Sequence, residues 1–399
     1  MSVAILAQVR LLEVHLLCSD LLDVHLLCSN PPTMVKSGTT STAKTLKPTV
    51  KDGANHVRVG CDFSGLCTLT YACKQIALDV PSLHIVHSHA CDKMRAPKKV
   101  IETLYPGGEF FRDVTKRDLN KVPYADLLSV TAPCQTFSNA GKHAGITDPR
   151  GLLVTHSLDL ISKKQPKCVI MENAKTLAGK YQSFMKYIID RLKLLNYNVS
   201  WKILDSRHYG LPQSRVRWYL LAIRKDVQRS NTAGISLWPP EKSSFTPLSD
   251  VVKPLPAQLW KPLPDESDTL GRANVLAAYT KLHSQGTNPF KVPVVVDMGA
   301  SPDFSSFQVG VCPTLTKTRA SGYGYWCSTK GGVLDETDIV KLQGFDASII
   351  NCKTLGISKS ALGGLIGNAQ SLPVVKAVAA HAMYHSKIIT LAELQSINL

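Results

Sequence analysis

The feature that most constrains the fold is an alternation of short apolar strands with helix-length segments over residues 57–224. Strand-like runs stand at 57–63, 84–88 and 127–131, and each is followed by a longer segment. Apolar residues then recur at helical spacing over 181–195. Such alternation is typical of a mostly parallel sheet covered by helices on both faces. We therefore expect a doubly wound α/β domain.

Changes in composition divide the chain of 399 residues. Prolines become frequent and periodicity is lost after about residue 225, and helical character returns near residue 335. We expect a flexible N-terminal tail and linker over 1–55 and a large domain over 56–224. A smaller, irregular domain should follow over 225–332, and residues 333–399 should return to the large domain.

The N-terminal tail contains a duplicated decapeptide, at residues 11–20 and 21–30, followed by a linker rich in Ser, Thr, Lys and Gly. Two short copies are too few for a solenoid. Acidic residues interrupt the apolar stretch, which argues against a targeting peptide. We expect this tail to have no catalytic role.

The formal charge of +16 points to a polyanionic partner. Residues 1–55 hold five basic and four acidic side chains, so a net +15 remains for the rest of the chain. A basic protein that is merely soluble is the alternative interpretation. No apolar run reaches the roughly 20 residues that span a bilayer, so no membrane partner is expected.

The cysteines and histidines indicate neither a disulfide framework nor a metal site. The eleven cysteines are scattered and form no CxxC pair, as is typical of a reducing compartment. His84, His87 and His89 stand close together, but no carboxylate or cysteine pattern completes a set of metal ligands. We expect no metal.

Cys134 is the cysteine whose surroundings suggest chemistry. It lies in Pro133-Cys134-Gln135, directly after an apolar strand-like run. A thiolate held just past a strand end by a proline is well placed to act as a nucleophile. The alternative is a free cysteine that packs as a small apolar residue.

Two further segments belong to the same predicted edge of the sheet. Phe63-Ser64-Gly65 ends the first strand, where small residues let a ligand approach the backbone. Glu172-Asn173 follows the strand at 168–171 and places a carboxylate at that edge. Considered alone, a segment such as Phe63-Ser64-Gly65 is more often a structural turn. A solvated strand end is the alternative interpretation of Glu172.

Arg215 and Arg217 stand two residues apart in Gln213-Ser214-Arg215-Val216-Arg217. Side chains alternate along a strand, so both arginines should lie on one face of an extended segment. They predict a functional pair, and the alternatives are two side chains that only hold phosphate or two surface charges.

In this order and spacing, the segments resemble the cytosine-C5 methyltransferases that use S-adenosylmethionine. The resemblance covers roughly residues 57–383 and includes segments at 148–153, 342–345 and 367–374 that are similar to further family motifs. It implies a Rossmann-like methyltransferase fold with a smaller target-recognition domain. It also implies methylation of C5 of cytosine in DNA on a base flipped out of the duplex.

The resemblance also implies the catalytic roles. Cys134 would add to C6 of the base, while Pro133 and Asn173 would shape the loop that carries it. Glu172 would hold N3 and the exocyclic amine and stabilise the adduct. The family arginine that contacts O2 matches Arg215, with Arg217 as its partner.

The cofactor-binding positions implied by the family are seven: Phe63, Ser64, Gly65, Asp92, Asp113, Asn368 and Ala369. The chain departs from the family pattern nearby. Cys67 and Thr68 stand where two glycines are usual, and their side chains would narrow the space beside the cofactor. Ala90 stands where an acid usually holds the ribose, a role that Asp92 would have to take over.

The segment 312–319 is similar to the Thr-Leu segment that family members present to the major groove. The resemblance implies a set of nucleic-acid contacts on this segment, on the catalytic loop and before the arginines. Its members are Gln135, Ser138, Gln213, Thr314, Lys317 and Arg319.

We therefore expect a DNA cytosine-5 methyltransferase, in the nucleus of a eukaryote or the cytoplasm or nucleoid of a bacterium. One rival is an enzyme that methylates RNA, although the Cys-Phe-Thr tripeptide usual in the tRNA-modifying branch is absent. A second is a nucleic-acid-binding regulator without activity, which the altered cofactor turn would suit. The recognition sequence and the oligomeric state stay open.

Overall fold

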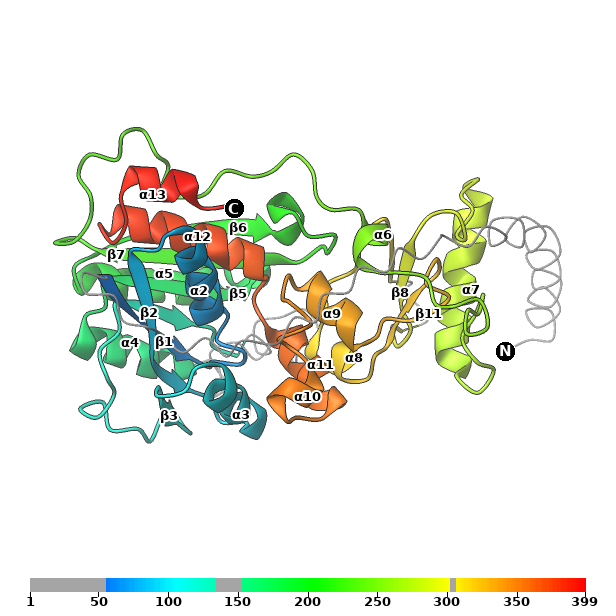
Figure 1. Cartoon of the computed structure of the whole chain (residues 1–399), viewed down its shortest axis with the longest axis horizontal. Coiled ribbons are helices and arrows are strands. Elements are labelled where there is room, and N and C mark those ends of the chain that lie inside the picture. Colours follow the sequence, from blue (N-terminus) through cyan, green and yellow to red (C-terminus); the bar gives the residue numbers. More distant parts are fainter. Residues whose placement is uncertain (1–54, 134–151, 302–305) are drawn as a thin grey trace, which may run out of the picture.

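A seven-stranded sheet forms the centre of the large domain in the structure, a computed structural model that describes residues 55–133, 152–301 and 306–399 (Figure 1). The strand order is β3-β2-β1-β4-β5-β7-β6. All neighbours pair in parallel except β7, which is antiparallel to both β5 and β6. The predicted mostly parallel sheet is confirmed. Its strands are β1 Asn55–Asp62, β2 Leu83–Cys91, β3 Glu109–Phe111, β4 Leu127–Val130, β5 Cys168–Ala174, β6 Tyr197–Asp205 and β7 Val216–Arg224.

Helices cover both faces of this sheet, so the doubly wound architecture is also confirmed (Figure 1). Successive strand residues point to opposite faces: in β4, Leu127 joins the core on one side and Leu128 the core on the other. The first face carries α2 (Thr68–Asp79) and α12 (Leu372–His385), and the second carries α4 (Leu153–Lys164) and α5 (Gln182–Leu194). Helix α3 (Arg95–Leu104) follows β2, and α13 (Leu391–Ser396) ends the chain. None of the described helices has the length and apolar character to cross a membrane.

A second, four-stranded sheet lies away from the first one (Figure 1). Its order is β11-β10-β8-β9, and its core packs against the long helix α7 (Thr269–Ser284) through side chains such as Tyr279 and Trp326. The region predicted to be irregular therefore contains regular structure. Its strands are β8 Val294–Asp297, β9 Phe307–Val309, β10 Tyr325–Cys327 and β11 Gly332–Val333, and the short helix α6 spans Leu248–Val251.

Residues 225–247, at the start of the predicted second domain, pack on the large domain. The indole N–H of Trp238 donates to Ser200 Oγ of β6 at 2.9 Å. The Tyr384 hydroxyl of α12 donates to the carbonyl of Thr232 at 2.9 Å. Residues 225–247 thus cover the large sheet before the chain reaches the smaller one.

Helices α8, α9, α10 and α11 lie between the two sheets (Figure 1). Close backbone packing joins α8 to α11: a Cβ at Gly363 or Gly367 would collide with the backbone of Ala320 or Thr316. From α11 the chain returns to the large sheet as α12. The four helices are α8 Lys317–Ser321, α9 Glu336–Leu342, α10 Cys352–Leu355 and α11 Lys359–Asn368.

Candidate active site

The candidate site lies where β1, β4 and β5 end at one edge of the large sheet. The backbone N–H of Thr131, just after β4, donates to the Asp62 carbonyl at 3.2 Å. Its hydroxyl donates to the Phe63 carbonyl at 2.9 Å. These bonds place the turn after β1 beside the segment that leads through Ala132 to Pro133. Cys134, Gln135 and Ser138 lie outside the described residues.

Glu172 is a buried carboxylate at this edge. It lies inside β5, which continues two residues beyond it, and its partner across the ladder is Tyr219 of β7. Arg217 Nε lies 3.2 Å from Glu172 Oε1. Burial raises the pKa of Glu172 above its ordinary value, although the charges of Arg215 and Arg217 act in the opposite direction. Glu172 therefore holds a proton more readily than an exposed glutamate.

The two arginines have different partners in the structure. Arg217 faces Glu172. Arg215 is 4% exposed, and its Nη1 donates to the carbonyls of Leu315 at 2.8 Å and Gly367 at 3.3 Å. Arg217 is the arginine at ion-pair distance from the carboxylate, whereas Arg215 binds backbone of the later segments and acts on Glu172 through its charge. The prediction that Arg215 contacts the base stays a prediction.

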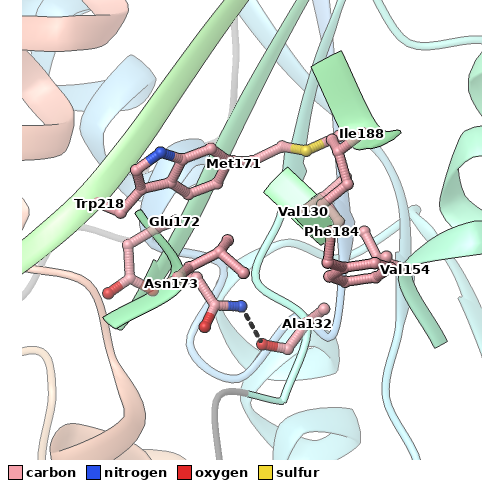
Figure 2. A pocket seen from close by; sticks show the side chains of 10 residues that line it. Val130, Ala132, Val154, Met171, Glu172, Asn173, Phe184, Ile188 and Trp218 are labelled. Atoms are coloured by element: carbon pink, nitrogen blue, oxygen red, sulfur yellow. Dashed lines mark hydrogen bonds between the residues drawn. The ribbon is translucent and has the colours of Figure 1, made fainter. Parts of the chain in front are cut away.

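Asn173 connects β5 to the segment before Cys134. Its Nδ2 donates to the Ala132 carbonyl at 3.3 Å, and its Oδ1 accepts the backbone N–H of Ala174 at 2.9 Å. Figure 2 shows the first of these bonds as a dashed line. Because Ala132 directly precedes Pro133, this contact is the kind that the predicted loop-shaping role of Asn173 requires.

A small pocket opens beneath this segment, between β4, β5, β7 and the helices α4 and α5 (Figure 2). Its walls are mainly apolar. Trp218 Nε1 is buried and has no hydrogen-bond partner among the described residues. The sequence analysis did not single out Trp218. The signal available was the alternation along β7, which places Trp218 on the face opposite Arg217. The lining residues are Val130, Ala132, Val154, Met171, Glu172, Asn173, Leu177, Phe184, Ile188 and Trp218.

The turn predicted to bind the cofactor is held against the end of β2. The backbone N–H of Ser64 donates to the Cys91 carbonyl at 3.0 Å. The N–H of Gly65 donates to Asp92 Oδ2 at 3.0 Å, and the N–H of Met94 donates to Asp92 Oδ1 at 2.9 Å. Ser64 Oγ is buried and lies beside the Cys67 thiol. The structure thus brings Ser64, Gly65 and Asp92 together, with Phe63 at the head of the turn.

The residues that depart from the family pattern lie in the core beneath this turn. Ala90 has no exposed surface, Cys67 is 1% exposed, and Thr68 is also buried. Burial raises the pKa of the Cys67 thiol, which is close to the thiol of Cys61. Cys67 has a positive φ of 51°, a conformation that favours glycine. The Cys67 side chain therefore points into the domain and away from solvent.

The remaining predicted cofactor residues occupy separate positions. Asp113, just after β3, accepts bonds from the backbone N–H and hydroxyl of Thr115, which lower the pKa of its carboxyl. Asn368 is exposed at the end of α11. Ala369 is buried, and its carbonyl accepts from Gln343 Nε2 at 2.5 Å.

The described residues predicted to contact nucleic acid make internal contacts. Gln213 has no exposed surface. Thr314 Oγ1 donates to the Ser214 carbonyl at 2.6 Å, and Lys317 Nζ lies 3.6 Å from Met94 Sδ. Arg319 Nε donates to Asp297 Oδ1 at 2.6 Å. Their roles toward nucleic acid stay predictions.

The family assignment rests on comparisons with known proteins. A family model described as C-5 cytosine-specific DNA methylase matches residues 63–383. The type II methyltransferase M.NgoBI of Neisseria gonorrhoeae is 28% identical over 273 residues, which cover 68% of this chain and 78% of that protein. M.NgoBV of the same organism is 35% identical over 133 residues.

Other matches are shorter or show the fold alone. Those to M.NgoBV and to M.BsuFI of Bacillus subtilis span only 31% and 28% of these relatives. These relatives are bacterial proteins and give no support to a nuclear location. The methyltransferase EhMeth of Entamoeba histolytica has the same fold, with a TM-score of 0.58 at 15% identity over 82% of this chain and 98% of that one. With its family model matched across most of its length, the chain belongs to the C-5 cytosine-specific DNA methylase family.

Proposed function

We propose that this protein transfers a methyl group from S-adenosylmethionine to C5 of cytosine in DNA. The observation that carries the proposal is the buried Glu172–Arg217 pair, at 3.2 Å, beside the segment that leads into Cys134. A carboxylate and an arginine held in this way match the polar edge of a cytosine, with its N3, its exocyclic amine and its O2. The family and the names of the bacterial relatives support the same reaction.

The thiolate of Cys134 supplies the step that makes C5 reactive. Cytosine C5 is too weak a nucleophile to accept a methyl group directly. When the Cys134 sulfur forms a bond to C6, the ring becomes enamine-like, and electron density moves to C5. After methylation, solvent water takes up the C5 proton, the C5–C6 double bond re-forms, and the C6–sulfur bond breaks with its electron pair returning to the thiolate. The target base must leave the duplex to reach such a site.

Glu172 and Arg217 stabilise the charge that develops on the ring. Because burial raises the pKa of Glu172, its carboxyl is able to share a proton with N3 and to accept from the exocyclic amine. Arg217 keeps the carboxyl oriented, and because it is the arginine at ion-pair distance from Glu172, we assign the donor to O2 to Arg217 in place of Arg215. Arg215 acts on Glu172 through its positive charge and also binds the carbonyls of Leu315 and Gly367.

The residues at the end of β1 and β2 fit S-adenosylmethionine, which would supply an electrophilic methyl group. Ser64 Oγ is buried in this turn beside the Cys67 thiol, and its hydroxyl is placed to bind a ligand oxygen or nitrogen. Phe63 and Gly65 would contact the cofactor through the turn, and Asp92 keeps an acid at the end of β2. Asp113, Asn368 and Ala369 complete the proposed site.

The test is methyl transfer from labelled cofactor to DNA and to tRNA, side by side, with wild type and Cys134→Ser. We expect label in DNA from wild type and none from the variant. Cys352→Ser, which changes a partly exposed thiol, is the control and should keep activity. DNA containing 5-fluorocytosine should also trap a covalent adduct on wild type alone. Label in tRNA only, or equal background from wild type and Cys134→Ser, would contradict the proposal.

A further inference from the structure

A segment of the smaller domain pairs with the residues that lead into β7. The backbone N–H of Ser214 donates to the Cys312 carbonyl at 2.8 Å, and the N–H of Cys312 donates to the Pro212 carbonyl at 2.7 Å. Gln213 and Cys312 form a parallel β-bridge. We call residues 312–319 the recognition segment. Its backbone is therefore bound directly to the residues that precede Arg215 and Arg217.

The side chain of Gln213 lies at the centre of this junction. Its Oε1 accepts the backbone N–H of Leu315 at 3.2 Å. Its Nε2 donates to the Leu342 carbonyl and to Gln343 Oε1, both at 2.8 Å. This amide has no exposed surface, and both its oxygen and its nitrogen are bonded within the protein. Gln213 instead joins the recognition segment to the end of α9.

Two routes continue from Leu315 to the loop that carries Asn368. In the first, Gln343 Nε2 donates to the Ala369 carbonyl at 2.5 Å, so Gln213 and Gln343 form a chain of amides. In the second, Arg215 Nη1 donates to the Leu315 carbonyl at 2.8 Å and to the Gly367 carbonyl at 3.3 Å. Both the N–H and the carbonyl of Leu315 are thus tied to residues 367–369.

Glycines let the same two segments touch through their backbones. Gly367 lies against Thr316 so closely that a Cβ on Gly367 would collide with it. Leaving a buried amide without a partner is costly, so a displaced Leu315 would have to move together with Gln213 and Gln343. The recognition segment and residues 367–369 therefore behave as one unit.

We propose that Gln213 is a positioning residue that couples binding of nucleic acid at the recognition segment to binding of cofactor at residues 367–369. This inference rests on the proposed function, because it assumes that both ligands bind. Each ligand fixes one end of the same buried network, so each stabilises the arrangement that the other needs. Coupling of this kind is reciprocal: each ligand tightens the binding of the other by the same factor.

The coupling factor is measured in a binding cycle with S-adenosylhomocysteine and a DNA duplex that wild type methylates. For wild type, S-adenosylhomocysteine should lower the DNA Kd at least about fivefold, within the usual range of allosteric coupling. The duplex should lower the Kd of S-adenosylhomocysteine by the same factor. Gln213→Met keeps the side-chain length but removes all three hydrogen bonds, and it should lower the factor at least about twofold while the Arg215 route stays intact.

Tyr325→Phe is the matched control. The Tyr325 hydroxyl donates to the Thr314 carbonyl at 2.9 Å and accepts the Thr316 N–H at 3.1 Å, so it holds the same segment from the other side. It makes no bond to residues 367–369. This variant should weaken DNA binding while it keeps the wild-type coupling factor. The proposal would be overturned if Gln213→Met kept the wild-type coupling factor, or if Tyr325→Phe lowered the coupling factor as much as Gln213→Met does.

Two further measurements protect the test against a misfolded variant. Gln343→Met cuts the first route at its other end and should lower the coupling factor as Gln213→Met does. The second measurement needs no variant: in the wild-type protein, addition of S-adenosylhomocysteine should slow hydrogen exchange of the Leu315 amide. Unchanged exchange at this amide would count against the proposal. A wild type that binds neither ligand would contradict the proposed function, whereas one that binds both with a factor of one would contradict only the coupling.

Discussion

The base side and the cofactor side of the site are built in different ways. On the base side, Glu172 of β5 and Arg217 of β7 are charged side chains that meet across neighbouring strands. On the cofactor side, polar contacts run mainly through backbone: the N–H groups of Ser64 and Gly65 bind the end of β2. Ala90, where the family usually has an acid, is part of the core.

This difference explains which departures from the family pattern the fold tolerates. A charge pair works only if both partners are present, because a buried charge without its partner is costly. A turn held by backbone bonds keeps its shape when side chains beneath it change. The base side should therefore be sensitive to single substitutions, and the cofactor side should resist attempts to restore the usual residues.

The largest effect is expected on the base side, from Glu172→Gln. The amide keeps the size of the side chain. It has no carboxyl group to share a proton with N3, and it has no negative charge to attract Arg217. We expect the rate of methyl transfer to fall about a thousandfold, as is typical when an acid or an oriented electrostatic group is removed. Single-turnover transfer of labelled methyl groups to DNA measures this loss.

Asp126→Asn is the control for this comparison. Asp126 is a buried carboxylate on the same sheet, just before β4 at the opposite edge, and it pairs with Lys167 at 3.1 Å. Its loss should lower stability but leave the rate per folded molecule within about threefold. Comparable rate losses in the two variants would remove the distinction between the base side and an ordinary buried carboxylate.

A smaller effect, on stability, is expected on the cofactor side from Ala90→Glu. Ala90 lies between Cys61 of β1 and Phe110 of β3 and has no exposed surface, so a carboxylate there would be buried. We expect the free energy of unfolding in urea to fall by about 3 kcal/mol, without tighter binding of S-adenosylhomocysteine. Ala90→Met, of similar bulk, separates overpacking from charge. A stable variant with improved cofactor affinity would show that the family position is open to the ligand.

The large sheet could be predicted from the sequence because its strands alternate with long periodic segments. The predicted strand at 127–131 is β4, Leu127–Val130, and the predicted carboxylate Glu172 lies beside Arg217. The smaller sheet could not be predicted, because strands of two to four residues carry no period. Neither could the contact of Gln213 with Leu315, which joins residues 102 positions apart.

The smallest predicted effect concerns two histidines on the cofactor side and the way their protonation makes stability depend on pH. There, His87 and His89 of β2 are buried, and their Nε2 atoms have no partner among the described residues. Burial lowers the pKa of His87 to about 3 and that of His89 to about 4; nearby positive charge such as that of Lys74 adds to the shift of His87, whereas Asp62 opposes that of His89. Both rings therefore stay neutral in the folded protein at pH 6, whereas the unfolded chain begins to take up protons near pH 6.5.

Because the unfolded chain binds more protons, stability falls as the pH falls below about 6.5. These two histidines should lower the free energy of unfolding by about 1 kcal/mol between pH 7 and pH 6, measured by urea denaturation at each pH. His56→Gln changes an exposed histidine at the start of β1 and should leave this loss unchanged. Stability that stays level or rises over this interval would mean that the rings accept protons in the folded state. The cofactor side would then hold charge in its core, as the base side does, and the contrast between them would fail.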